Sequence, residues 1–235
     1  EIYNAPELRR VLQAAGHQFR TNSDTEVLLK SYLEWGQSAV EKLNGMFAFV
    51  LHDRRRNTVL AARDAFGIKP LYRVRVGNDV LYASEIKALL QHPGVRASLD
   101  RVALEDYLSL QLVMGGRTLF DGIEKVEPAM LEVLDLDRMT LKSARYWSLD
   151  FNGEQSTSDP ARTRELIEAS VKRQMQSDVP VGSMLSGGLD SSGIAALVRR
   201  GLGASLENLR GYTWNIEPDS RNEHTTVEAT SVLSV

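Results

Sequence analysis

The sequence contains no cysteine, no long apolar run and little net charge. Without cysteine, these 235 residues cannot form a disulfide, a thiolate metal site or a cysteine nucleophile. No apolar segment reaches the roughly 18 residues that cross a bilayer, and no signal peptide opens the sequence, so we expect a cytoplasmic protein. The net charge of -3, with both signs intermingled, gives no reason to expect a nucleic acid or a membrane as partner.

What is present has the composition of a soluble globular protein, with 43% hydrophobic residues. The length suits one large or two modest domains. The stretch with the clearest chemical signature is 179–197, which reads VPVGSMLSGGLDSSGIAAL. An apolar strand is expected to lead into a turn at SGGLDSS and then into a helix. Glycines, hydroxyls and the amides of a helix start all suit a phosphate group.

The first part of the chain predicts two helices, then strands, then further short helices and a closing hairpin. Asn4 and Ser23 as caps, with Gly16 and Gly36 at the ends, mark the first two helices. Runs with strand character follow, which we interpret as an antiparallel meander. The expected helices are 4–16, 23–36, 85–90 and 101–110, and the expected strands are 46–51, 58–62, 71–76, 80–83, 131–136 and 139–141.

A polar stretch at 150–160 (DFNGEQSTSDP) is the expected linker between two domains. After it, a helix at 161–176 leads into the apolar strand before SGGLDSS, and 209–216 predicts another strand. Alternation of strand and helix is typical of a parallel α/β sheet. The tail from 217 shows at best a weak helical pattern. We therefore expect the second domain to be incomplete.

SGGLDSS after a strand resembles the pyrophosphate-binding loop of the ATP pyrophosphatases. The segments EIYN, NSDTEVLL, LNGMFAF, RDAFGIKPLY and ASEIKAL, between residues 1 and 89, are similar in order and spacing to the glutaminase domain of glutamine-hydrolysing asparagine synthetases. The resemblance implies an α+β N-terminal-nucleophile glutaminase domain at 1–149, an αββα sandwich of two antiparallel sheets. It also implies a linker at 150–160 and a truncated α/β parallel-sheet ATP-binding (PP-loop) domain at 161–235.

The resemblance implies that Glu1 and Asp24 contact glutamine: Glu1 lines the pocket and Asp24 pairs with the substrate's α-ammonium. No catalytic residue carries over, because the family's cysteine nucleophile and its oxyanion-hole residues match no position of this sequence. Asp24 has a plainer interpretation, since a carboxylate at a helix start interacts favourably with the helix dipole. Glu1 could equally be solvated.

The resemblance also implies ATP binding, glutamine and aspartate as substrates, and is compatible with a homodimer. The β-carboxylate of aspartate would attack ATP to give β-aspartyl-AMP, which ammonia from the glutaminase domain converts to asparagine. Asp190 is assigned to Mg²⁺, because a carboxylate faces phosphate only with a metal between them. Trp214 could instead be a core residue. The ATP-binding residues implied are Leu185, Ser186, Gly187, Gly188, Leu189, Asp190, Ser191, Ser192 and Trp214.

Two other functional interpretations stay open. One is a related amide-forming enzyme, such as a β-lactam synthetase, or an amidotransferase acting on another carboxylate in peptide or polysaccharide modification. The other is a chain that only folds or binds. In either case we expect these 235 residues alone neither to hydrolyse glutamine nor to make asparagine.

Two further segments have structural interpretations. Arg63 and Asp64 would be costly to bury unless they pair with each other or with main-chain groups. The basic run 54–56 is interpreted as a solvated turn.

Overall fold

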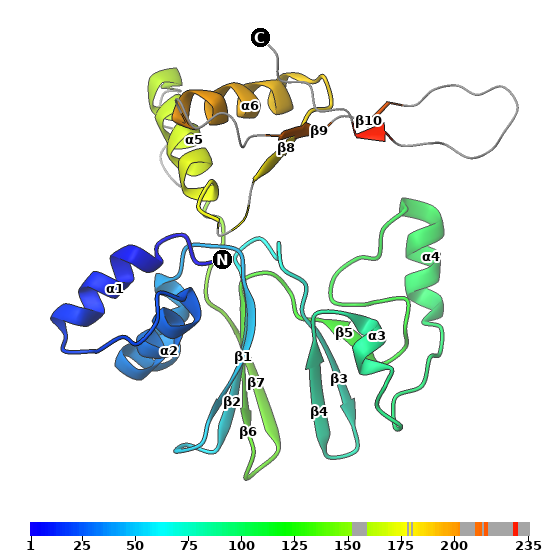
Figure 1. The fold of residues 1–235 in the computed structure, drawn as a ribbon. Coiled ribbons are helices and arrows are strands. Elements are labelled where there is room, and N and C mark those ends of the chain that lie inside the picture. The colour runs from blue at the N-terminus through cyan, green and yellow to red at the C-terminus, as the bar shows by residue number, and fades with distance from the viewer. Residues whose placement is uncertain are drawn as a thin grey trace, which may run out of the picture. The chain divides into compact units, whose positions relative to one another are not determined.

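The computed structural model of the chain describes residues 1–151, 159–177, 179, 181–202, 210–212, 214, 215, 228 and 229. The chain divides into two compact units, Glu1–Asn152 and Gly153–Val235 (Figure 1). Within the described ranges, no helix is both long and apolar enough to cross a membrane.

The first unit contains two antiparallel sheets. One has the strand order β1-β2-β6-β7 and the other has the order β4-β3-β5. The strands are β1 (Ala48–Asp53), β2 (Thr58–Arg63), β3 (Tyr72–Val76), β4 (Asp79–Ala83), β5 (Ile123–Lys125), β6 (Met130–Asp135) and β7 (Thr140–Arg145). The prediction of one meander is therefore wrong: β2 pairs with β1 and β6, whereas β3 pairs with β4 and β5. The loop between β2 and β3 carries the chain from one sheet to the other.

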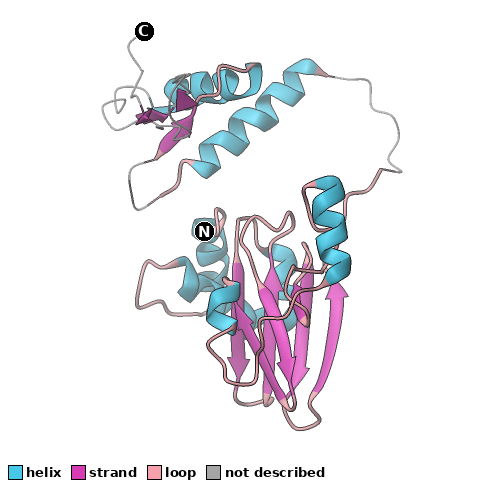
Figure 2. Cartoon of the chain, turned by 90° about the vertical axis from the view of Figure 1, so that its right-hand side faces the viewer, coloured by secondary structure: helices cyan, strands magenta, loops and turns pink. Residues whose placement is uncertain are grey.

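Helices cover the outer face of each sheet (Figure 1), and Figure 2 shows the helices and strands of the chain in separate colours. The helices are α1 (Ala5–Ala14), α2 (Asp24–Trp35), the 3-10 helix η1 (Gly36–Lys42), α3 (Ile86–Leu89) and α4 (Arg101–Leu110). Tyr32 of α2 packs with Leu51 and Leu60 of the four-stranded sheet, and Leu89 of α3 packs with Val74 of the three-stranded sheet. This is the αββα sandwich that the family resemblance implied.

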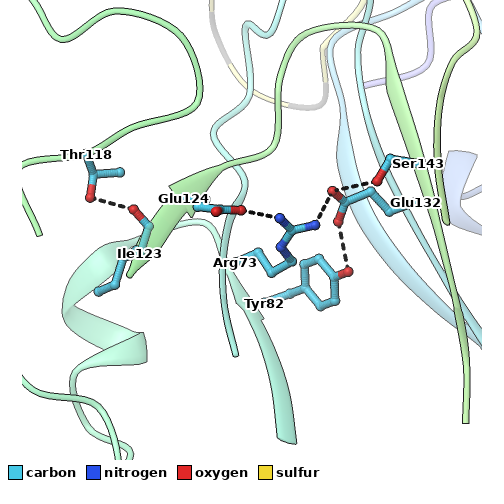
Figure 3. A network of polar contacts seen from close by, with 7 residues as sticks. All are labelled: Arg73, Tyr82, Thr118, Ile123, Glu124, Glu132 and Ser143. Atoms are coloured by element: carbon cyan, nitrogen blue, oxygen red, sulfur yellow. Dashed lines mark hydrogen bonds and ion pairs between the residues drawn. The ribbon is translucent and has the colours of Figure 1, made fainter. Parts of the chain in front are cut away.

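The facing surfaces of the two sheets meet through a small apolar cluster and a polar network (Figure 3). Glu132 of β6, only 5% exposed, accepts hydrogen bonds from Arg73 of β3 at 2.6 Å and from Tyr82 of β4 at 2.9 Å. Arg73 also forms an ion pair with Glu124 of β5. Burial and the nearby Glu132 carboxylate raise the pKa of the Tyr82 hydroxyl. The network links the two sheets and provides partners for Glu132, which would be costly to bury alone.

The second unit begins with α5 (Pro160–Gln174), followed by β8 (Gly182–Met184), α6 (Leu189–Leu202) and β9 (Arg210–Tyr212). Strands β8 and β9 pair in parallel, so β8-α6-β9 is the strand-helix-strand unit that the sequence predicted. The predicted strand 209–216 contains β9 and the short β10 (Trp214–Asn215). β10 pairs in antiparallel with β11 (Glu228–Ala229), which lies in the tail where the sequence shows a weak helical pattern. Most of the predicted linker lies outside the described residues.

Candidate functional sites

The predicted glutamine-binding residue Glu1 lies on a short extended segment that pairs with residues 44–46. The Glu1 carbonyl accepts the Met46 amide at 3.0 Å, and the Tyr3 amide donates to Asn44 at 2.7 Å. Gly45 allows this close pairing, because a Cβ there would lie 2.2 Å from the Glu1 carbonyl oxygen. No other residue fits without moving the main chain.

Asp24, the second predicted glutamine-binding residue, is the first residue of α2. Its Oδ2 atom accepts the Ile2 amide at 3.0 Å and lies 3.9 Å from the Glu1 backbone nitrogen. The helix cap is provided by Ser23, whose Oγ accepts the Thr25 amide. The carboxylate is thus turned toward the Glu1 segment, and it remains about a third exposed. The structure brings Glu1 and Asp24 together across 22 residues of sequence.

Asn4 is a residue of this region whose role sequence reasoning missed. We interpreted it as the cap of α1, and it does occupy the position before the helix, but its side chain makes no cap hydrogen bond. The side-chain Nδ2 of Asn4 donates to the Lys42 carbonyl at 2.8 Å, and its Oδ1 accepts a hydrogen bond from the Asn44 backbone amide at 2.9 Å. Asn4 therefore holds the segment that carries Gly45. No local pattern distinguishes this role from capping.

The loop after β2 is structural rather than a ligand site. Asp64 is fully buried, and its carboxylate accepts four backbone amides, those of Phe47, Phe66, Ile68 and Lys69. Arg63 donates to the carbonyl oxygens of Gly67, Lys69 and Val126. The expectation that main-chain groups satisfy both charges is confirmed. Gly67, with φ of 65°, closes the turn.

The second candidate site is the SGGLDSS loop between β8 and α6. Gly187 has φ of 78°, which favours glycine, and its Cα faces open space. The hydroxyls of Ser186 and Ser191 lie 3.0 Å apart, and the Ser186 amide donates to the Ser191 hydroxyl at 3.2 Å. The Leu185 amide donates to Tyr212 of β9 at 2.6 Å, which joins the start of the loop to the sheet.

The amides at the start of α6 are oriented for an anion. The Ser192 amide donates to the Gly188 carbonyl at 3.1 Å, and the amides before it have no acceptor one helical turn back. Leu189 and Asp190 are exposed in this first turn, Leu189 by 89%. Backbone donors, hydroxyls and the positive end of the helix dipole therefore converge on one exposed surface. These groups fit a phosphate.

The remaining predicted contacts are less defined. Trp214 lies in β10, where the structure describes only the main chain. Within the described ranges, no group of three or more His, Cys, Asp or Glu side chains could hold a metal ion. Asp190 is the single carboxylate of the loop. That donor set fits Mg²⁺ only where phosphate oxygens supply further ligands, which is the usual arrangement at nucleotide sites.

Comparison with known proteins gives matches in both units. A glutamine amidotransferase domain family model matches residues 1–147, and an asparagine synthase family model matches residues 162–231. Asparagine synthetase [glutamine-hydrolyzing] 3 of Bacillus subtilis is 44% identical over 200 residues, which are 84% of this chain and 32% of the relative. Asparagine synthetase [glutamine-hydrolyzing] 1 of the same organism is 42% identical over 202 residues, 85% of this chain and 32% of the relative. The chain spans about a third of the length of these curated relatives.

Among solved structures, the B. subtilis glutamine phosphoribosylpyrophosphate amidotransferase complexed with ADP and GMP aligns with a TM-score of 0.43 and 18% identity. The alignment covers 98% of this chain and 50% of that one.

Proposed function

Because the chain belongs to the glutamine amidotransferase domain family, we propose that it is part of an ATP-dependent ligase that transfers glutamine nitrogen to aspartate. Residues 1–149 would form the glutaminase domain, 150–160 the linker, and 161–235 the beginning of the ATP-binding domain. The observation that supports the proposal is that one chain carries two different candidate sites. One pairs Asp24 with the Glu1 segment, and the other is the loop between β8 and α6.

In the first unit, Asp24 would pair with the α-ammonium group of glutamine, and Glu1 would line the pocket. The Asp24 carboxylate is a suitable partner for an α-ammonium group, since it is partly exposed and the cap of α2 is supplied by Ser23. Gly45 and Asn4 would act as positioning residues by fixing the segment against which Glu1 lies. The hydrolysis that releases ammonia requires a nucleophile that none of these residues provides.

In the second unit, the loop would bind the phosphates of ATP. The β-carboxylate oxygen of aspartate attacks the α-phosphorus, the bond to the bridging oxygen breaks, and pyrophosphate leaves with its electron pair. Ammonia then attacks the β-aspartyl-AMP carbonyl, AMP leaves, and asparagine forms with loss of a proton. Charge develops on the departing pyrophosphate, where the amides at the start of α6 and the hydroxyls of Ser186 and Ser191 would stabilise it. Asp190 would hold Mg²⁺ together with phosphate oxygens.

The test is aspartate-dependent exchange of labelled pyrophosphate into ATP by the full-length protein that contains this chain. Exchange that requires aspartate supports the proposal. A folded protein that binds ATP but shows exchange only with a different carboxylate would overturn aspartate as the acceptor. The function would then be amide formation on that other carboxylate. No exchange with any carboxylate would reject the ligase function.

Asp190→Asn tests the metal assignment in the same protein. We expect loss of Mg-ATP use while the circular dichroism spectrum stays unchanged. The matched control is Asp159→Asn, since Asp159 caps α5 instead and accepts the Ala161 amide. Exchange at the normal rate by the Asp190 variant would remove this residue from the mechanism.

A further inference from the structure

A groove in the first unit lies between α2 and the tip of the β1–β2 hairpin, and neither proposed site includes it. It encloses about 1040 Å³ and is lined by five basic and three acidic side chains. Its cations are Arg20, Lys30, Arg54, Arg55 and Arg56. In a chain with a net charge of -3, this is a local excess of positive charge.

Each of the three carboxylates that line the groove already has a hydrogen-bond or ion-pair partner within the first unit. Glu26 accepts the amides of Arg20 and Thr21 and the Thr21 hydroxyl. Asp53 accepts the Tyr32 hydroxyl at 2.9 Å and the Arg55 and Arg56 amides.

The third carboxylate belongs to Glu34, whose Oε2 lies 2.8 Å from Nε2 of His17. His17 itself does not line the groove. Each carboxylate of the groove therefore already has a partner other than these basic side chains. Across the described part of the chain, the side chains of Arg20, Lys30, Arg54 and Arg55 form no ion pair within 4.0 Å. Arg56 lies 3.9 Å from Asp53, so the other four cations of the groove have no described carboxylate within 4.0 Å.

The arginines are not needed to form the hairpin turn. The β6–β7 hairpin makes the same turn: Asp135 accepts the amides two and three residues later, as Asp53 does. Each turn ends on a residue with positive φ, Asn57 at 49° and Met139 at 50°. The second hairpin, however, has a single arginine at its tip, Arg138. The run Arg54–Arg56 therefore needs a reason other than turn geometry.

The groove also has an apolar wall. Leu29 and Leu33 lie one turn apart on α2 and are 47% and 60% exposed. Tyr32 lies on the same helix, and its hydrogen bond to Asp53 joins the wall to the base of the hairpin. The groove is therefore lined by the basic side chains of the hairpin and by the apolar side chains of α2, and the Tyr32–Asp53 hydrogen bond connects these two elements.

We propose that this groove binds a small organic phosphate, with the phosphate at Arg54 and Arg55 and the apolar body on Leu29 and Leu33. Guanidinium groups match a phosphate in bidentate geometry, and several of them together favour a group with more than one negative charge over a single carboxylate. The volume is sufficient for a ligand of nucleotide size. This inference is independent of the proposed function, because it involves neither Asp24 nor the loop before α6.

The test is titration of the full chain with phenyl phosphate, inorganic phosphate and benzoate, monitored by amide NMR. Phenyl phosphate should bind more tightly than the other two and should shift the amides of residues 54–57 and of α2. Arg54→Ala/Arg55→Ala should weaken this binding by about tenfold or more. Leu29→Ser/Leu33→Ser should weaken phenyl phosphate binding but not phosphate binding.

The matched control is Arg96→Ala/Arg138→Ala, which removes the same charge and includes the arginine of the equivalent turn. It should leave the affinity within about twofold, as should Gly187→Ala in the second unit. Equal weakening by both double-arginine variants would mean that only net charge matters and would overturn the proposal. Amide shifts confined to residues 185–192 would also overturn it, since binding would then belong to the loop.

Discussion

At the scale of single residues, Asp64 shows how one charge can organise a loop. The side chain is fully buried, yet its carboxylate satisfies four amides that would otherwise lack acceptors. We predict that Asp64→Ala lowers the free energy of unfolding of the first unit by about 3 kcal/mol, because unsatisfied buried donors cost roughly 1–3 kcal/mol each and part of the loop can relax toward water. Urea unfolding followed by tryptophan fluorescence measures the change.

Asp79→Ala is the control for this prediction. Asp79 begins β4 at the surface, with a side chain that is 68% exposed, so its loss should change the free energy by less than about 0.5 kcal/mol. A stability of Asp64→Ala equal to that of this control would mean that the loop amides find water instead, and that the carboxylate is dispensable.

At the scale of elements, the start of α2 depends on Glu26. The hydrogen bond from the Thr21 hydroxyl, followed by that from the Arg20 amide, lowers the pKa of Glu26 from 4.5 to about 2. A depressed pKa stabilises the fold above pH 4.5, and this contribution is lost as the pH falls through 2. Thr21→Val should raise the pKa of Glu26 toward 4.5, whereas Thr21→Ser should keep it near its original value. Carboxyl NMR titration measures both, and equal midpoints in the two variants would contradict the assigned cause.

The loop before α6 allows a comparison of two adjacent glycines. Gly187 has a positive φ, so Gly187→Ala strains the main chain although the added Cβ meets nothing within 4 Å. At Gly188 a Cβ would only touch the Ser186 hydroxyl at 3.4 Å. We predict that Gly187→Ala weakens pyrophosphate binding about tenfold, since an L-residue in this region costs about 1–2 kcal/mol, and that Gly188→Ala binds nearly normally. Calorimetric titration decides between them, and equal affinities would show that the loop conformation is not what binds the anion.

Local patterns predicted most elements because local chemistry forms them. Ser23 caps α2 and Asp100 caps α4, and α4 has the bounds 101–110 that its sequence indicated. Which strands pair could not be predicted in the same way. β5 has three residues and no period to detect, and the separation of β2 from β3 depends on the buried Asp64, which pairs with groups up to 17 residues away. The same limit applies to Asn4 and to the groove beside Arg54, where distant segments meet.

At the scale of the whole molecule, the two units differ in how much they bury. The first has apolar clusters on both sides of each sheet. In the described part of the second, the buried side chains are Ala195 and Val198, both of α6, and α5 buries none. Leu166 and Ile167 of α5 are 55% and 46% exposed. Burial of apolar surface is the main source of stability, so these residues contribute little to holding α5 in place.

We therefore predict that this 235-residue chain opens locally in the second unit long before the first unit unfolds. Without tertiary packing, a helix of 15 residues such as α5 is marginally stable in water. Its amides should exchange with deuterium at least about 100-fold faster than those of β2, which is paired on both edges. Hydrogen exchange with mass spectrometry measures both segments in one experiment, and Asp64→Ala should accelerate exchange in β2 without changing α5. Protection of α5 equal to that of β2 would contradict the prediction, because it would require an apolar partner for Leu166 and Ile167.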